Sequence, residues 1–330
     1  MYRPVSRLTA LAASLMVPLA TGCSDADRSA TDATNSPTTA AITTVSTGAE
    51  SPTGSFAVGT VAPTYADAER AFHRGRYEEA ASMFEAYSES DPDNAWGHYM
   101  LGLSAWKTGD HTRALEAFDA ALRLDPTHRK SLLNSARVLL ETSRPKDALE
   151  RVEQALAIEP LSGEGLRLLG RARHQLGDIA QAIDAYQRAI ALDDRDVWAM
   201  NNLGFVYIQQ DRSDAALLPL ARAVELRGNV PVFQNNFGTA LERSGHFVAA
   251  RQAYEKALEA DSTYSKAAVG LARVTAHGAE SATSAADVAT LAREFQGEVE
   301  RWRARAVTPD TTTAADSVGA TGMARDSVGQ

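Results

Sequence analysis

The stretch that decides the fold runs from Tyr99 to Pro126 and reads YMLGLSAWKTGDHTRALEAFDAALRLDP. Gly109 lies at its centre, where a left-handed backbone conformation can end one helix and start a tight turn. Pro126 closes the stretch, because proline stops a helix that precedes it. The stretch therefore predicts two helices joined by a short turn, which together form one helical hairpin.

This pattern recurs along the chain with a period of 34 residues. Proline follows a predicted helix end at Pro92, Pro126 and Pro160. Small residues keep the same step at Ala68, Gly102, Ala136, Gly170, Gly204 and Gly238, and again at Ala80, Ala114, Ala148, Ala182, Ala216 and Ala250. Large apolar residues do so at Phe84, Phe118, Val152, Tyr186, Leu220 and Tyr254. A fixed period held by three kinds of residue is typical of repeat proteins, in which stacked hairpins bury a continuous core.

The repeat resembles the tetratricopeptide repeat over roughly residues 61–277. A second stretch, NNFGTALERSGHFVAARQAYEKALEAD at residues 235–261, carries nearly the whole pattern. The resemblance implies an all-α fold: a right-handed superhelix, or α-solenoid, of about six helical hairpins over residues 62–277. In such repeats the small residues let two antiparallel helices approach closely, and the large residue fills the space between hairpins.

The fifth repeat departs from the pattern in two ways. Asp211 stands where most repeats have a turn glycine, and Pro219 falls inside the predicted second helix. A proline within a helix costs about 3 kcal/mol unless the geometry adapts. We therefore expect a kink or a local break at Pro219.

The C-terminal end of the solenoid needs a cover. Residues 284–305 predict an amphipathic helix, with Ser284 and Asp287 as a capping-box-like start and Phe295, Val299 and Trp302 on one face. The other face is charged, as expected of a solubilising capping helix. The alternative is an amphipathic helix that binds a partner.

The N-terminus predicts export. Residues 1–22 combine Arg3 and Arg7 with a short apolar run and end in small residues before Cys23. This resembles a bacterial lipoprotein signal peptide, although Ala20 stands where leucine is usual. The resemblance implies that Cys23 is lipidated and becomes the first mature residue. The alternatives are an ordinary cleaved signal peptide or a retained helix.

The predicted anchor suggests a location. We expect an exported protein held in the cell envelope by its lipid, with the outer membrane weakly favoured, because Ser24 and not aspartate follows the cysteine. Residues 23–61 are rich in Thr, Ser and Ala and predict a disordered tether, and residues 306–330 predict a disordered tail.

Composition and motifs narrow the function classes. The formal net charge is −9, which argues against a nucleic-acid partner. The single cysteine excludes an intramolecular disulfide and a cysteine-based metal cage. Motifs for metal hydrolysis, phosphate binding or a nucleophilic serine are missing from the sequence. We expect no catalysis, no metal and no cofactor.

The resemblance implies that the first helix of each hairpin lines a concave groove. The residue two places before the small one is Asn134, Asn202 or Asn236 in three of the repeats, and Leu168 and Met100 interrupt this series. Such asparagines either hydrogen-bond the backbone of a bound peptide or satisfy polar groups between helices. The other predicted groove residues are Arg137, Arg167, Arg171, His174, Tyr99, Trp106 and Phe205. The arginines either favour an acidic or C-terminal-carboxylate ligand or pair with Glu141 and Glu164.

Three hypotheses for function follow. The first is a membrane-anchored scaffold or adaptor that binds peptide segments of partner proteins in its groove. The second is a lipoprotein assembly factor for a secretin, a pilus or another outer-membrane complex. The third is an arm that recruits substrates to an enzyme. The oligomeric state and the partner's identity do not follow from the sequence.

Overall fold

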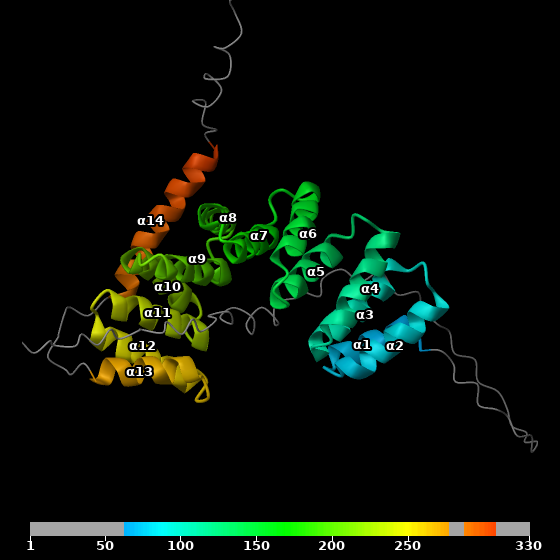
Figure 1. The fold of residues 1–330 in the computed structure, drawn as a ribbon, viewed down its shortest axis with the longest axis horizontal. Coiled ribbons are helices and arrows are strands. Elements are labelled where there is room, and N and C mark those ends of the chain that lie inside the picture. The colour runs from blue at the N-terminus through cyan, green and yellow to red at the C-terminus, as the bar shows by residue number, and fades with distance from the viewer. Residues whose placement is uncertain (1–62, 277–286, 308–330) are drawn as a thin grey trace, which may run out of the picture. The chain divides into compact units, whose positions relative to one another are not determined.

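The computed structural model of the chain describes residues 63–276 and 287–307, and these residues form fourteen α-helices and no β-strand. The first twelve helices pair into six hairpins, whose two members we call the first and the second helix (Figure 1). The hairpins are α1 (Tyr65–His73) with α2 (Tyr77–Ser90), α3 (Ala95–Thr108) with α4 (His111–Leu124), α5 (Arg129–Glu141) with α6 (Pro145–Ile158), α7 (Gly163–Leu176) with α8 (Ile179–Leu192), α9 (Val197–Gln209) with α10 (Ser213–Leu226), and α11 (Pro231–Arg243) with α12 (Phe247–Ala260). A lone helix, α13 (Ser265–Ala276), and a long one, α14 (Val288–Val307), follow.

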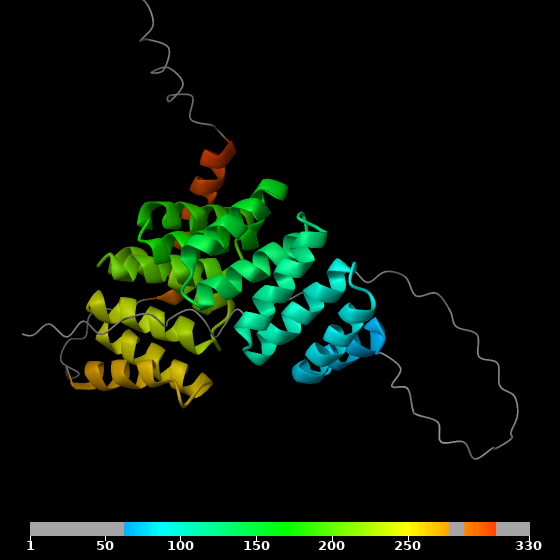
Figure 2. The same cartoon turned by 45° about the vertical axis from the view of Figure 1, so that its right-hand side comes forward.

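Each hairpin packs on the next along the chain. The second helix of one hairpin contacts the first helix of the following one, from α2 with α3 to α12 with α13. First helices of neighbouring hairpins also contact each other, and the stacked pairs can be followed from blue to gold in Figure 2. The predicted all-α solenoid of six hairpins is therefore confirmed. The predicted signal peptide, Cys23, the tether and residues 308–330 lie outside the described residues.

The close approach of the two helices in a hairpin depends on the small residue of the first helix. A Cβ atom added to Gly204 would lie 2.4 Å from Cγ of Leu220, and one added to Gly170 would lie 2.5 Å from Cε1 of Tyr186. Both large side chains are almost fully buried. Gly102 meets Phe118 and Gly238 meets Tyr254 in the same way, so in four hairpins the small and the large residue are two sides of one contact. Burial of each large side chain contributes about 1.5–3 kcal/mol.

The turns inside the hairpins share one backbone conformation. Gly75, Gly109, Gly177 and Gly245 have φ between 75° and 86°, as the sequence predicts. Ser143 and Asp211 stand at the same place in their repeats and adopt φ of 58° and 57°. Short polar residues tolerate this left-handed region better than most, so the missing glycines do not change the hairpin.

Of the kink or local break expected at Pro219, the break does not occur. Helix α10 runs from Ser213 to Leu226 as one α-helix, with the same length as α4 and α8, and Pro219 is buried within it. The hydrogen bond that proline cannot donate is one among the helix's many, and burial of the ring in the core offsets part of its cost.

Helix α14 exists as predicted but does not cover the C-terminal end of the solenoid. It packs against α10 and α8, the second helices of the fifth and fourth hairpins. Asp287 caps its start, because its carboxylate accepts the backbone N–H of Ala289 at 3.1 Å, and the other predicted cap residue, Ser284, lies outside the described residues. The apolar face of α14 is buried at Ala292, Phe295 and Val299. The helix thus packs on the side of the solenoid formed by α8 and α10.

We predict that Gly204→Ala lowers the free energy of unfolding by about 1–3 kcal/mol, because the new methyl group overlaps the buried Leu220 side chain. Gly163→Ala is the matched control. It lies at the start of α7 with no atom within 4 Å of the added Cβ, so stability stays the same or rises by up to about 1 kcal/mol. Urea denaturation of both variants tests this. Equal stability of the two variants would contradict the packing account.

Candidate functional site

The predicted groove residues all lie on first helices, but most of them are not exposed. The structure places Tyr99 and Trp106 on α3, Asn134 and Arg137 on α5, Arg167, Arg171 and His174 on α7, Asn202 and Phe205 on α9, and Asn236 on α11. Only His174 and Phe205 are half-buried, and the other eight side chains are buried. The first helices therefore contribute more to the core than the repeat pattern suggests.

A row of hydrogen bonds joins residues that are 35 positions apart. The Asn134 side-chain amide donates to the Tyr99 hydroxyl at 3.3 Å, and the Asn236 amide donates to Oδ1 of Asn201 at 2.9 Å. Each bond connects the first helices of two neighbouring repeats, one position beyond the 34-residue register. Burial raises the pKa of Tyr99 to about 12, so its phenol stays protonated in this row.

A second row with the same spacing lies two helical turns further along these helices, about 10 Å away. The indole N–H of Trp106 donates to Oε2 of Glu141 at 2.8 Å, and His174 Nε2 shares a hydrogen bond with Oε1 of Gln209. Two side chains reach backbone carbonyls in the same way: Gln175 donates to Leu140 at 3.2 Å and Arg243 to Ile208 at 2.9 Å. We call the two sets of bonds the inter-repeat ladders.

Two of the three predicted asparagines, Asn134 and Asn236, are part of these ladders. Asn202 accepts from the Asn201 amide at 3.4 Å, and Asn236 accepts from the Asn235 amide at 3.3 Å while it donates to Asn201. Asn134 accepts from Arg137 at 3.0 Å. These contacts favour the interpretation in which asparagine satisfies polar groups between repeats, since an unpaired buried amide would cost about 1–3 kcal/mol.

The basic character expected of the groove is reduced by pairing. Arg137 lies 2.5 Å from Glu164, and its side chain is 2% exposed. Arg167 lies 3.2 Å from Asp196, which the sequence did not single out. Glu141, the other expected partner, instead accepts from Trp106 and lies 3.5 Å from His111. Two of the three predicted arginines are thus matched by carboxylates of this chain, which weakens the case for an acidic ligand at these positions.

The accessible part of the predicted set is small and well defined. The rings of His174 and Phe205 meet edge to face with their centroids 5.9 Å apart, and the exposed Gln209 adjoins His174. We call these three residues the His174–Phe205 patch. An aromatic ring, an imidazole and an amide offer apolar contact and hydrogen bonding side by side, as peptide-binding surfaces do.

The sequence did not reveal a second accessible aromatic residue. Trp96, in the first turn of α3, is 44% exposed. Its ring lies 4.8 Å from His128 and 5.5 Å from Tyr99, and the Lys130 ammonium lies 5.3 Å from it. Trp198 holds the same repeat position but is less exposed and packs on Phe233. The recurrence of tryptophan marks the position, although only the structure shows which one is open.

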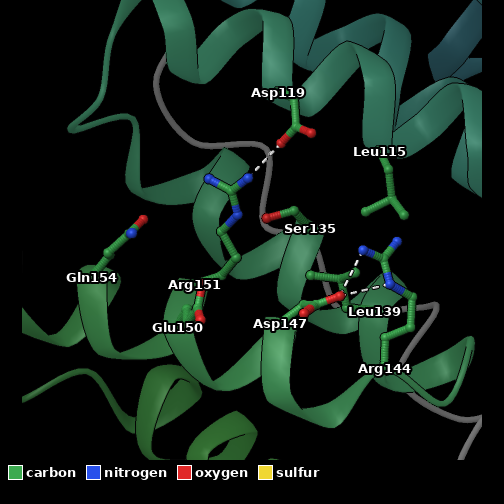
Figure 3. A pocket seen from close by; sticks show the side chains of 9 residues that line it. All are labelled: Leu115, Asp119, Ser135, Leu139, Arg144, Asp147, Glu150, Arg151 and Gln154. Atoms are coloured by element: carbon green, nitrogen blue, oxygen red, sulfur yellow. Dashed lines mark hydrogen bonds and ion pairs between the residues drawn. The ribbon is translucent and has the colours of Figure 1, made fainter.

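A hollow of about 300 Å³ lies between α4, α5 and α6 (Figure 3). Its charged lining is paired internally: Arg151 with Asp119 at 2.7 Å and Arg144 with Asp147 at 2.6 Å. Leu115 and Leu139 are its apolar residues. Sites for small molecules are mostly apolar with a few unpaired polar groups, and this hollow has the opposite composition.

Five profiles described as tetratricopeptide or TPR repeats match residues 65–129, 105–172, 170–211, 197–230 and 233–264. Together these matches cover more than half of the chain, so the fold and the repeat pattern define a tetratricopeptide-repeat protein. The chain belongs to this family, whose fold typically serves as a non-catalytic scaffold that binds proteins or peptides.

Individual relatives are distant. The chain is 28% identical over 163 residues to the human protein O-mannosyl-transferase TMTC1. This match covers 48% of this chain and 18% of that protein. Because the match covers so little of the transferase, it gives no information about transferase activity in this chain. The chain resembles one chain of the crystal structure of the APC/C hetero-tetramer Cut9-Hcn1 with a TM-score of 0.57 and 20% identity, over 63% of this chain and 41% of that chain. It also resembles a tetratricopeptide repeat protein from Parabacteroides merdae with a TM-score of 0.54 and 12% identity, over 63% and 81% of the two chains. The two structures support the fold alone.

Two further observations concern the described residues. Among residues 63–276 and 287–307, every helix is too short or too polar to span a lipid bilayer. The same residues contain no group of three or more His, Cys, Asp or Glu side chains that could hold a metal ion.

We predict that Asn236→Ala lowers the free energy of unfolding by about 1–3 kcal/mol, because it leaves Oδ1 of Asn201 buried without this donor. The control is Gln209→Ala, an exposed member of the other ladder, with an expected loss of less than about 0.5 kcal/mol. A double-mutant cycle with Asn201→Ala should give a coupling of at least about 0.5 kcal/mol. Additive losses in this cycle would show that the bond does not join the two repeats.

Proposed function

We propose that this protein is a scaffold, anchored in the cell envelope by a lipid on Cys23, that binds peptide segments of partner proteins on the face formed by its first helices. The solenoid carries this proposal, since six hairpins in one register present six first helices side by side. Repeats of this kind offer an extended surface and no reaction centre.

Within that face, we assign recognition to the His174–Phe205 patch and to Trp96. These side chains are accessible, whereas the asparagines are buried, and Asn134 and Asn236 are bonded between repeats. Aromatic side chains are enriched among residues that dominate binding energy, because they bury a large area at a low cost in side-chain entropy. Recognition therefore depends on side-chain anchors of the partner more than on its backbone.

The anchor would give the scaffold its place. A lipid-modified Cys23 would hold the protein at a membrane while residues 23–61 separate it from the solenoid. Ser24 after the cysteine is compatible with the outer membrane, if the organism has one.

The groove is tested by quantitative capture of partners from cells that express the tagged protein. We predict that a His174→Ala, Phe205→Ala double variant loses its enriched partners by at least tenfold, since removal of a central aromatic anchor costs about 2 kcal/mol or more. Val248→Ala is the matched control, an exposed apolar residue on the second helix α12. Capture of the same partners at the same yield by the double variant would refute the assignment.

The anchor is tested separately. We predict that Cys23→Ser moves the protein from the membrane fraction to the soluble fraction and removes the lipid mass from its N-terminal peptide, as read by mass spectrometry. Ser24→Ala should leave both properties unchanged. An unlipidated wild-type protein would rule out the anchor and leave the groove unaffected.

A further inference from the structure

Both α14 and the surface formed by α10 and α8 contribute to the docking of α14. On α14, the buried residues Ala292, Phe295 and Val299 follow one another at steps of three and four, which places them on one stripe of the helix. Trp302 continues the stripe and packs edge to face on Phe295, with the ring centroids 5.6 Å apart. In Figure 1, α14 lies along α8 and α10, in agreement with its contacts.

The seat on α10 is specific to the fifth repeat. Two repeat positions on the outer side of the second helix are polar in every other hairpin: Ser82, Glu116, Glu150, Asp184 and Gln252 at one, and Glu85, Asp119, Glu153, Gln187 and Glu255 at the other. In α10 these positions hold Leu218 and Ala221, and Ala221 is fully buried. Apolar residues thus replace polar ones at two neighbouring positions of α10. Without α14, this apolar surface would be exposed to water.

A polar contact fixes the position of α14 along this seat. Arg303 donates from Nε to the backbone carbonyl of Ala191 at 2.9 Å and lies 3.1 Å from Asp194. Ala191 is in the last turn of α8, where unpaired carbonyls and the helix dipole attract a positive charge. The seat thus selects a helix with an apolar stripe followed by an arginine.

Helix α14 has a lower share of buried side chains than any other helix of the described residues. Among its residues 288–305, three side chains are fully buried. Gly297, with no atom within 4 Å of where a Cβ would lie, weakens the helix from within. Elements with few buried contacts open at a lower free energy than the core does.

We propose that the surface of α8 and α10 is a second protein-binding site, which takes an amphipathic helix from a partner protein, and that α14 is its occupant in the same chain. The partner helix would carry the α14 pattern, with aromatic residues seven apart on an apolar stripe and an arginine directly after the second one. This site lies on second helices and is independent of the His174–Phe205 patch. A partner helix and α14 compete for it, so release of α14 opens the site.

The test uses a fluorescent peptide of residues 287–307 and the full chain, with binding followed by anisotropy. An occupant that fills the site weakens a competing ligand in proportion to the fraction of open sites. We predict that Phe295→Asp, which expels α14, binds the peptide at least tenfold more tightly than the wild-type chain does. Arg303→Ala releases α14 less completely, because it removes no apolar contact, and should tighten peptide binding by a smaller factor. The exposed control Arg305→Ala should leave peptide binding unchanged.

The seat is tested by restoring the charge that the other repeats carry. Ala221→Glu combined with Phe295→Asp should abolish peptide binding while circular dichroism shows an unchanged solenoid. If the release variants bind the peptide no better than the wild-type chain, or if Ala221→Glu has no effect, the second site does not exist. A concentration-dependent dimer of the wild-type chain that exchanges α14 would overturn the assignment to a partner protein, because the occupant would be a second copy.

Discussion

The contact between a small residue on one helix and a large residue on the next controls this structure. Gly204 against Leu220 and Gly170 against Tyr186 set how close the two helices of a hairpin lie. Once that distance is the same in every hairpin, each hairpin presents the same surface to the next, and stacking becomes regular. The register then brings polar side chains of successive first helices together at a step of 35 residues, where they form the inter-repeat ladders. The ladders are thus a consequence of the packing.

The packing of the repeats also determines which side chains of the first helices are accessible. Side chains that look like ligands for a peptide, such as Asn236 and Arg137, are partners for the neighbouring repeat. What remains accessible is a short set of aromatic and polar groups at Phe205, His174 and Trp96. The second helices, in contrast, are polar at the two outer positions that Leu218 and Ala221 hold in α10, and there the chain supplies its own cover, α14. The two proposed surfaces differ in position and in chemistry.

The sequence predicts the hairpins well because each small and large residue repeats at a fixed step and serves one contact. It predicts the candidate site less well, because periodicity gives the face of a helix but not the partner across the next repeat. Tyr99 and Asn134 lie on the expected face, yet they bond to each other. The repeat pattern alone does not place α14, because the difference of Leu218 and Ala221 from Glu116, Asp119 and the equivalent residues appears only when all six second helices are compared. The sequence does not show whether a proline interrupts a helix, and Pro219 lies inside the continuous helix α10.

Native-state hydrogen exchange measured residue by residue tests most directly the claim that the first helices form one continuous core and that α14 is a separately held cover. The account predicts that amides of α5 and α9, whose side chains are almost all buried, exchange only through global unfolding. It predicts that amides of α14 exchange through a local opening of lower free energy. If α14 were protected as strongly as α9, or if α5 opened independently of its neighbours, the central claim would be contradicted.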